Sequence, residues 1–420
     1  MPDYHNRIAP KAGTAMVGKL AVQLRHLARP RAWTGLVFAV AAVWLAACAG
    51  GPPPGVVMTP AGPETPGQQA TPGAIGVGQV RIGLLLPQSA TGNAGLVAQS
   101  MKNAAEMALA EFKNPDIQLL LKDTGGSAPG AQAAAQQAVS EGAELIVGPL
   151  FAQSVAAVAQ VARGRGIPVI AFSTDTSVAA RGVYLLSFLP ETDVDRIVSY
   201  AVSRGKRSFA ALVPDNAYGS VVEAAFRQAV ARRRARVIAL ERYPADRSNM
   251  QTPVQRVAQA ARQADALFLP DSGDAVAVIV QGLTSAGVNM KRLQLLGTGV
   301  WDGDQRIFGD AAVQGGWFAA PGSAGYQSFV GRYRQRYGQE PVRTATLVYD
   351  AVALVAALVK TQGAQRFAED VLTNSSGFAG IDGIFRFRRD GTNQRGLAVL
   401  RVTPTGGQVI SPAPRSFAGG

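Results

Sequence analysis

The sequence contains very few of the side chains that most enzymes use for chemistry at neutral pH. Its 420 residues include two histidines and one cysteine. Both histidines, His5 and His26, precede an apolar run at residues 33–47, so a chain cleaved after that run keeps neither. Histidine is the usual general base and metal ligand near pH 7, and cysteine is a ready nucleophile. Most hydrolase and zinc mechanisms are therefore excluded, and we expect no metal, no cofactor and no enzyme activity.

Other catalytic motifs are equally weak. The sequence has no P-loop and no G-x-S-x-G element. Ser203 and Lys206 match S-x-x-K, but the companion S-D-N and K-T-G motifs are absent, and the pair ends a predicted helix instead of opening one. The remaining acid pairs lie in loops, where acids usually cap helices. The pattern therefore indicates a binding protein.

Composition favours a globular, exported chain with an excess of basic groups. Apolar residues make up 47% and charged residues 16%, which is enough apolar content for two domains with cores. The formal net charge is +13, and removing residues 1–47 leaves about +8. For an exported chain, this balance favours anionic lipid or cell-wall material and not nucleic acid. The cluster Arg232–Arg236 is predicted as the solvated last turn of a helix, where cations complement the dipole.

The only cysteine stands directly behind the apolar run. Residues 33–47 are preceded by Arg29 and Arg31 and end in small residues, which is the layout of a secretory signal. A membrane-spanning helix needs about twenty apolar residues, so a permanent anchor of this length is not favoured. The segment before the run is long, and both Met1 and Met16 remain candidates for the start.

The four residues Leu-Ala-Ala-Cys that end at Cys48 resemble the lipobox of bacterial lipoproteins. The resemblance implies that a signal peptide at 1–47 is removed and that Cys48 carries a lipid. Ala49, in place of an aspartate, implies sorting to the outer membrane, so we expect a periplasmic, lipid-anchored protein. The following segment, 48–79, is rich in proline and glycine and is predicted to be a tether that reaches about 90 Å when extended.

From Val80 onward, short apolar runs alternate with segments of helix length. The runs near residues 80, 117, 144, 167 and 183 lack the alternation of a half-exposed strand and suit parallel strands buried on both faces. The pattern restarts after a helix near 193–203, with runs near 208, 236, 266 and 293. We therefore predict an α/β fold of two doubly wound, Rossmann-like lobes.

The C-terminal part has a different character. Two helices are predicted around 326–337 and 345–360, followed by alternating strands and an Asp390-Gly391 turn that indicate an antiparallel hairpin or meander. We assign residues 80–189 and about 322–410 to lobe 1 and residues 190–321 to lobe 2.

Candidate ligand-binding residues follow the predicted strands. In open α/β sheets, ligands bind beyond the carboxyl ends of the strands, where helix N-termini present free N–H groups. The loops at these positions are rich in Ser, Thr, Gly and Asp, which suits a small carboxylate. The same residues also serve as helix caps and turn residues, so capping stays open for each hydroxyl. Phe151, Tyr218 and Trp301 are candidate apolar walls, with packing in the core or at the rim as the other interpretation.

The order and spacing of these segments resemble the leucine/isoleucine/valine-binding type of periplasmic binding protein. The resemblance covers about Val80 to the C-terminus, through "VRIGLLLPQSATGNAG", "ELIVGPLFAQS", "SFAALVPDNAYG" and "GIFRFRRDG". It implies two lobes joined by three crossovers that close on a ligand, in the manner of a Venus flytrap. It also implies carboxylate anchors at Ser154 and at Ser173 or Thr174, with Ser89 and Tyr218 at the rim.

The resemblance leaves two functions open. Amino-acid binders of this family carry an acid in the loop after the last strand of lobe 2, where this chain reads Gly-Thr-Gly-Val-Trp, and the nearest acid is Asp302. The first function is the binding of an amino acid or similar carboxylate for the permease of an ABC importer. The alternative is activation of a penicillin-binding protein in peptidoglycan synthesis, because such lipoproteins share the fold, the lipobox and a long tether.

Overall fold

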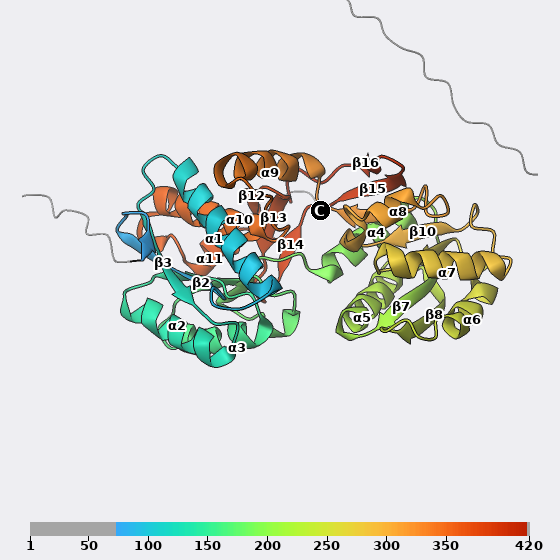
Figure 1. The fold of residues 1–420 in the computed structure, drawn as a ribbon, viewed down its shortest axis with the longest axis horizontal. Coiled ribbons are helices and arrows are strands. Elements are labelled where there is room, and N and C mark those ends of the chain that lie inside the picture. The colour runs from blue at the N-terminus through green and yellow to red at the C-terminus, as the bar shows by residue number, and fades with distance from the viewer. Residues whose placement is uncertain (1–72, 418–420) are drawn as a thin grey trace, which may run out of the picture. The chain divides into compact units, whose positions relative to one another are not determined.

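The computed structural model describes residues 73–417, which belong to one compact unit of the chain. The expected signal peptide at 1–47, the lipid site at Cys48 and most of the expected tether at 48–79 lie outside these residues. Within the described range, no helix has the length and apolar character needed to cross a bilayer. Figure 1 shows two α/β lobes built from separate sheets.

The first sheet has six strands in the order β1-β3-β2-β4-β5-β6. All of its pairings are parallel except that of β1, which runs antiparallel along the edge of β3. Strands β2 to β6 coincide with the apolar runs that the sequence showed, and most of their residues are buried, whereas β1 lies in the segment predicted to be a tether. They are β1 (Ala74–Ile75), β2 (Val80–Leu86), β3 (Ile117–Asp123), β4 (Leu145–Val147), β5 (Val169–Ala171) and β6 (Val183–Leu185).

Helices cover both faces of this sheet. Along β2, Leu84 packs in the core under α1 and α10, whereas its neighbour Leu85 packs in the core under α2 and α3. Alternate side chains of a strand point to opposite faces, so a run that is apolar throughout needs a helical layer on each side. The helices are α1 (Asn93–Glu111), α2 (Ala128–Ser140), α3 (Ala152–Arg163), α9 (Ser323–Tyr337), α10 (Ala345–Thr361) and the short α11 (Glu369–Leu372).

The second sheet has seven strands in the order β16-β15-β11-β10-β9-β7-β8. Pairings from β7 to β11 are parallel, and β15 and β16 add antiparallel. Separate cores lie on its two faces, one under α4 and α5 and the other under α6, α7 and α8. The strands are β7 (Ser208–Asp215), β8 (Arg236–Pro244), β9 (Ala266–Phe268), β10 (Gln294–Gly297), β11 (Trp317–Ala320), β15 (Ala398–Thr403) and β16 (Gly406–Ser411).

The helices of this lobe complete a second doubly wound layer structure. They are α4 (Pro190–Ser203), α5 (Ala217–Arg232), α6 (Gln251–Ala261), α7 (Gly273–Ser285) and α8 (Gln305–Gly309). Short 3-10 turns follow in the loops, as η1 (Thr176–Val178), η2 (Gly299–Trp301) and η3 (Gly363–Gln365). The prediction of two doubly wound α/β lobes is confirmed.

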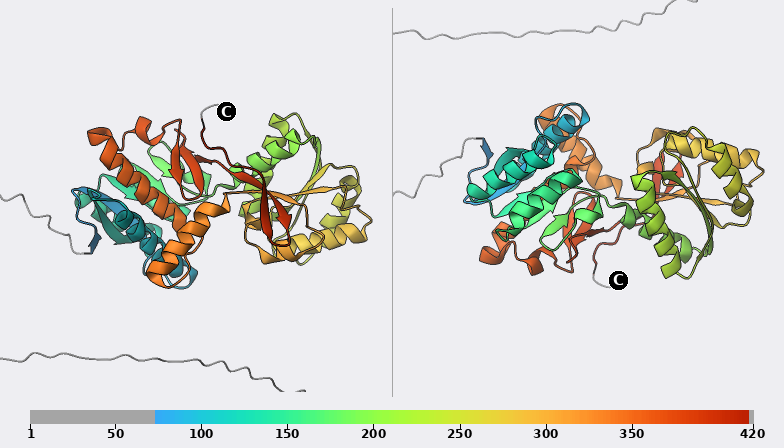
Figure 2. Two further views of the ribbon diagram at one scale, coloured as in Figure 1. Left: turned by 90° about the horizontal axis from the view of Figure 1, so that it is seen from above. Right: turned by 90° about the horizontal axis from the view of Figure 1, so that it is seen from below.

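The chain passes between the two sheets three times. The crossings lie between β6 and α4, between β11 and α9, and between β14 and β15. The last crossing corrects the expected boundary, because residues 398–410 were assigned to lobe 1, but β15 pairs with β11 and β16 pairs with β15 in the second sheet. In Figure 2 the red C-terminal strands accordingly lie in the lobe that carries the green and yellow segments. A hairpin pattern in a sequence predicts the pairing of its two strands but not the sheet that they join.

A third, small sheet lies in lobe 1. Its strands are β12 (Phe378–Gly380), β13 (Gly383–Phe387) and β14 (Asn393–Arg395). β13 and β14 form the antiparallel hairpin predicted around Asp390-Gly391. Gly391 has a φ of +85°, and an added Cβ would lie 2.2 Å from the carbonyl oxygen of Val183. The turn therefore requires glycine both for its backbone angle and for its close approach to β6.

Candidate ligand-binding site

The loops that carry the candidate residues lie at the carboxyl ends of parallel strands. In the first sheet the strand order reverses between β2 and β4, and in the second it reverses between β7 and β9. Loops on either side of such a point diverge to opposite faces of the sheet and leave a crevice between them. Ser89 follows β2, Phe151 follows β4, and Tyr218 follows β7. Each lobe therefore places predicted residues at its own reversal point.

In lobe 1, the reversal point contains a helix N-terminus without a side-chain cap. The N-cap of α3 is Phe151, which makes no capping hydrogen bond, whereas Ser127 caps α2 by accepting from the Gly130 N–H. The first-turn N–H groups and the positive end of the α3 dipole therefore face the loop without a side-chain acceptor. Phe151 itself is half-buried. This arrangement suits a small anion beside the end of β4.

Ser89 lies on the other side of this point and is exposed. Its backbone N–H donates to Asp123 Oδ1 at 3.2 Å, and the Gly125 N–H donates to the same oxygen at 2.9 Å. Burial alone would raise the pKa of Asp123, but hydrogen bonds from Ser89 and Gly125 outweigh it and lower the pKa. Asp123 therefore stays ionised and holds the loop after β2 against the loop after β3.

The predicted carboxylate anchors of lobe 1 differ in their availability. Ser154 is fully buried, and its Oγ donates to the Ser127 carbonyl at 3.3 Å, so its hydroxyl joins α3 to the start of α2. Ser173 is 4% exposed, and its Oγ accepts from the Asp175 N–H at 3.1 Å. Thr174 is exposed. The two serine hydroxyls thus have structural partners, and Thr174 is the open hydroxyl of the set.

In lobe 2, Tyr218 and Thr298 join the loops after β7 and β10. Their hydroxyl oxygens are 2.9 Å apart. Burial raises the pKa of Tyr218 above its usual value, although the bond to Thr298 opposes the shift. The phenol therefore stays neutral and can both donate and accept. Thr298 is fully buried and was not among the predicted site residues.

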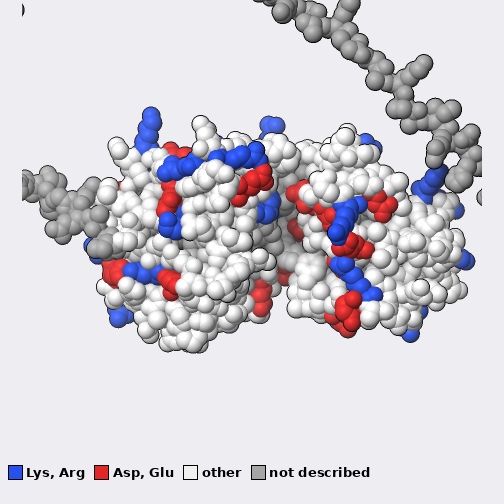
Figure 3. Space-filling view, in the orientation of Figure 1, with Lys and Arg blue, Asp and Glu red and all other residues white. Residues whose placement is uncertain are grey.

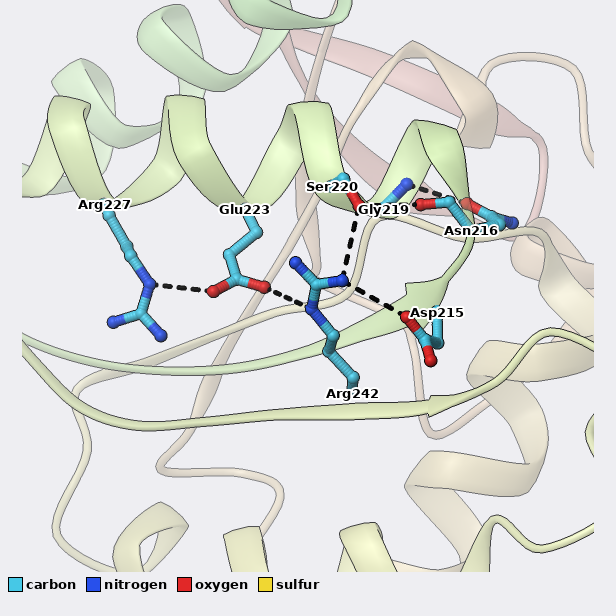
Figure 4. A network of polar contacts seen from close by, with 7 residues as sticks. All are labelled: Asp215, Asn216, Gly219, Ser220, Glu223, Arg227 and Arg242. Atoms are coloured by element: carbon cyan, nitrogen blue, oxygen red, sulfur yellow. Dashed lines mark hydrogen bonds and ion pairs between the residues drawn. The ribbon is translucent and has the colours of Figure 1, made fainter.

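Figure 4 shows a polar network at the start of α5, the helix whose first turn contains Tyr218. Asn216 caps α5 by accepting from the Gly219 N–H at 2.8 Å. Arg242, on β8, bonds Asp215 at 3.2 Å and Glu223 at 2.7 Å, and so ties the end of β7 to the first turns of α5. Each exposed ion pair contributes about 1 kcal/mol or less, but together they restrict the start of the helix. The network therefore holds the first turns of α5, which carry Tyr218, against β7 and β8.

Trp301 is a core residue, so the expectation that it forms a ligand wall is wrong. It is fully buried in the core under α6, α7 and α8, and its Nε1–H donates to the Asp271 carbonyl at 3.0 Å. A Cβ added at Gly297 would lie 2.2 Å from its ring. An exposed position was predicted because the residue follows a strand end, but the η2 turn directs the indole back under the sheet.

Two acids lie at the η2 turn: Asp302 follows it, and Asp193 of α4 bonds its backbone. Asp302 stays exposed, yet the surrounding protein raises its pKa by desolvation, against the attraction of Arg343. Asp193, in the first turn of α4, accepts the Gly299 N–H at 2.9 Å. Burial raises the pKa of Asp193 to about 7, while the Gly299 bond and the positive charge of Arg395 oppose the rise. The protonation of Asp193 is thus coupled to the backbone of the loop that carries Asp302.

A polar cluster beside the crossovers was not predicted from the sequence. The guanidinium of Arg343 bonds both carboxylate oxygens of Asp382, at 2.6 and 2.9 Å. It also lies over the ring of Phe188 at 4.6 Å and that of Tyr326 at 4.3 Å. Asp382 is fully buried, and the Arg343 side chain is 33% exposed. Because Arg343 is held by a bidentate ion pair and two aromatic rings, it is a rigid cation whose charge acts on Asp302 of lobe 2.

Sequence reasoning missed these residues because their local signals are ordinary. Asp193 lies in the first turn of a helix, where acids complement the dipole of most helices. Arg343 precedes α10, and Asp382 lies in a two-residue turn between β12 and β13. Their pairing joins positions 39 apart in the chain. No pattern of spacing within a single element indicates such a pair.

The described residues contain no group of three or more His, Cys, Asp or Glu side chains that could hold a metal ion. The side chains at the two reversal points are hydroxyls, a phenol, an aromatic ring and isolated acids. They can orient a small polar ligand by hydrogen bonds and dipoles. They do not form a nucleophile paired with a base.

Comparison with known proteins agrees with this architecture. A family model described as periplasmic binding protein matches residues 79–408. Among solved structures, one from Rhodospirillum rubrum, assigned to branched-chain amino acid ABC transport, is 21% identical with a TM-score of 0.71 and covers 79% of this chain and 99% of its own. Among curated proteins, no sequence matches significantly.

Two further solved structures contain bound ligands. A solute-binding protein from R. palustris in complex with benzoate is 19% identical, has a TM-score of 0.56, and covers 81% of this chain and 97% of its own. A substrate-binding protein from Desulfitobacterium hafniense in complex with Leu is 16% identical, has a TM-score of 0.58, and covers 79% and 99%. At these identities the likeness shows the fold.

Proposed function

The chain belongs to the periplasmic binding protein family, and from this premise we propose that it is a solute-binding protein for an ABC importer. Its ligand is an amino acid or a similar small carboxylate, held between the crevice residues of the two lobes. The observation that carries the proposal is the pair of reversal points, where hydroxyl, phenol and backbone N–H groups lie at the carboxyl ends of parallel strands. Solute binding, not catalysis, is the activity that such donors support.

The carboxylate of the ligand binds at the N-terminus of α3. This N-terminus lacks a side-chain cap, and the exposed residues Ser89 and Thr174 belong to the loops on its two sides; the Ser89 side chain also hydrogen-bonds Asp123. A helix N-terminus contributes about 0.3–2 kcal/mol to an anion, and hydrogen bonds to the charged group add about 1.5–3 kcal/mol each. Phe151 provides the apolar contact. The two ligands bound by the similar structures, Leu and benzoate, share only an apolar body and a carboxylate.

Lobe 2 closes over the remainder of the ligand. The Tyr218–Thr298 hydroxyl pair presents a neutral group that can donate or accept, and Asp302 presents a carboxylate for a ligand amine. Protonation of Asp302 would weaken an amine contact, and its raised pKa means that the contact weakens at a higher pH than with an ordinary aspartate. An amino acid therefore uses both lobes, whereas a simple carboxylate uses lobe 1 and the hydroxyl pair.

The proposal includes export and lipid attachment. The lipobox at Cys48 and the proline-rich tether support a periplasmic protein held to the outer membrane by a lipid. Metabolic labelling with a palmitate analogue tests this part. We expect label on the wild-type chain and none on the Cys48→Ser variant, and label on both chains would refute attachment at Cys48.

The binding function is tested by thermal unfolding of the purified chain with a panel of amino acids and aromatic carboxylates. A ligand at a hundred times its dissociation constant adds about 2.7 kcal/mol of stability, which raises the melting temperature by several degrees. The Tyr218→Phe variant should lose part of that rise, and the Tyr200→Phe variant, with its ring packed in the α4/α5 core, serves as the matched control.

A different outcome would contradict the proposal. If no solute raises the melting temperature and the chain instead binds a purified penicillin-binding protein, the carboxylate proposal is wrong. The alternative of an activator of peptidoglycan synthesis would then take its place. Equal losses in the Tyr218→Phe and Tyr200→Phe variants would remove the assigned role of the Tyr218 hydroxyl.

A further inference from the structure

A cavity lies beside the crossovers. It has a volume of about 770 Å³, and its lining comes from α4, the end of α5, the β13–β14 hairpin and residues 412–417. Six arginines and two acids line it. On the face drawn in Figure 3, by comparison, basic and acidic side chains lie next to one another in most places.

The arginines of this cavity are not neutralised evenly. Asp195 pairs with Arg232 at 2.8 Å and with Arg233 at 2.9 Å. Among the described residues, the other four make no ion pair with a carboxylate: Arg196, Arg386, Arg388 and Arg395. The second acid of the lining, Glu191, accepts from the Thr176 hydroxyl at 3.1 Å. The cavity therefore has a positive potential that its own acids do not cancel.

Two of these arginines are held in place by neutral acceptors. Arg196 donates to the Leu397 carbonyl at 2.9 Å and to the Ser411 hydroxyl at 2.7 Å. Arg386 donates to Gln394 and to the Ser375 carbonyl, and it lies 4.6 Å from the ring centroid of Phe417. Neutral acceptors orient a guanidinium and leave its charge uncompensated. Such preorganised cations are typical of oxyanion sites.

Arg395 lies behind the cavity wall, where the carboxylates of Asp350, Asp382 and Asp193 attract its charge. It is 4% exposed, its Nε donates to the Ser187 carbonyl at 3.1 Å, and Nη1 and Nη2 have no hydrogen-bond partner among the described residues. Arg388 is exposed at the end of β13 and also lacks an ionic partner there. The cations of the cavity without a carboxylate partner among the described residues are therefore Arg196, Arg386 and Arg388.

The part of the cavity formed by the end of α5 lies far from the crevice residue Tyr218. Tyr218 lies in the first turn of α5, and Arg232 is its last residue. At about 1.5 Å per residue, the 16 residues of this helix separate its two ends by about 22 Å. The crevice lies at the carboxyl ends of the strands, whereas the last turn of α5 lies at the opposite edge of the sheet.

We propose that this arginine-lined cavity binds a ligand that carries two or more phosphoryl groups. Several uncompensated guanidinium groups need a multivalent anion, and phosphoryl oxygens accept the forked N–H groups of arginine. A free oligophosphate and a phosphorylated lipid headgroup share this chemistry. The site does not depend on the proposed transport function.

The probe is sodium tripolyphosphate, titrated into the full chain by calorimetry at 150 mM NaCl. Arg388→Ser is the test variant, and the adjacent Arg389→Ser is the matched control, because Arg389 is also exposed but does not line this cavity. We expect saturable binding that weakens about five-fold or more in Arg388→Ser and stays within about two-fold in Arg389→Ser. A parallel arm measures sedimentation with phosphatidylglycerol vesicles.

The outcomes separate the two phosphoryl sources and also test the proposal. If Arg388→Ser weakens the binding of tripolyphosphate, the ligand is a free oligophosphate. If Arg388→Ser weakens only the binding to vesicles, the ligand is a lipid headgroup. Failure of both probes to bind would overturn the proposal, as would equal weakening by the two variants, because equal weakening indicates attraction by net charge alone. The carboxylate crevice would be unaffected by either result.

Discussion

Replacing Asp193 by asparagine tests whether the carboxyl of Asp193, which bonds the η2 backbone, has a raised pKa in the folded protein. The pKa of this carboxyl rises from 3.8 to about 7, chiefly through burial. A group with a raised folded-state pKa contributes stability that is present below pH 3.8 and is lost as pH rises through 7. Fully developed, this shift corresponds to about 4 kcal/mol at pH 8. Because Asp193 keeps some solvent exposure, we expect about 2 kcal/mol.

Asparagine keeps an acceptor for the Gly299 N–H and removes the charge. The Asp193→Asn variant should therefore equal the wild type near pH 4 and exceed its free energy of unfolding at pH 8, as measured by urea denaturation. Asp195, two residues along α4, is the matched control, because its pKa shifts the other way. Burial opposes ionisation of Asp195, but its bonds to Arg233 and Arg232 outweigh burial, so its pKa is lowered. Asp195→Asn should lose stability near pH 7 and regain wild-type behaviour as pH falls below 3.8.

The reasoning would be refuted if Asp193→Asn were less stable than the wild type at pH 8. That result would mean that Asp193 is ionised in the folded protein, held by Arg395 and the η2 backbone. An unchanged pH profile would mean that its carboxyl titrates as it does in the unfolded chain. Both results would also remove the coupling between Asp193 and the loop that carries Asp302.

Two further substitutions test the packing and the polar cluster. In Gly297→Ala the new Cβ would lie 2.2 Å from the Trp301 ring. We therefore expect the variant to lose about 1–3 kcal/mol of stability, measured as a lower melting temperature. An unchanged melting temperature would show that Trp301 moves freely. The lysine of Arg343→Lys cannot bond both oxygens of the buried Asp382. We therefore expect the free energy of unfolding, measured by urea denaturation, to fall by about 1–3 kcal/mol. Arg388→Lys is the control and should change it little, because Arg388 is exposed.

Much of the fold was predictable because parallel strands need apolar residues on both faces. The nine apolar runs from Val80 to Gly297 all became strands, because buried parallel strands carry a continuous apolar signal. β11 was missed because the strand has only four residues and follows a loop. The sheet joined by β15 and β16 was also missed, because antiparallel pairing is a local property and the choice of sheet is not.

The candidate site was predictable only in part. The loops after β2, β4 and β7 were identified because their position after a strand is written in the chain order. Exposure was not predictable, since Trp301 and Thr174 both follow strand ends and only Thr174 is exposed. Whether a hydroxyl caps a helix or faces the crevice depends on neighbours far away in the chain, as the bond between Ser154 and Ser127 shows.

The order of apolar runs and turn residues by itself determined two α/β lobes and the edge of each sheet where a ligand would lie. Hydrophobic period and chain order are sufficient for this, because they act over a few residues at a time. The tertiary structure alone decided the partners of the charged groups. The Arg343–Asp382 pair, the Asp193–Gly299 bond and the uncompensated arginines depend on which distant segments meet beside the crossovers, and burial there sets their electrostatics.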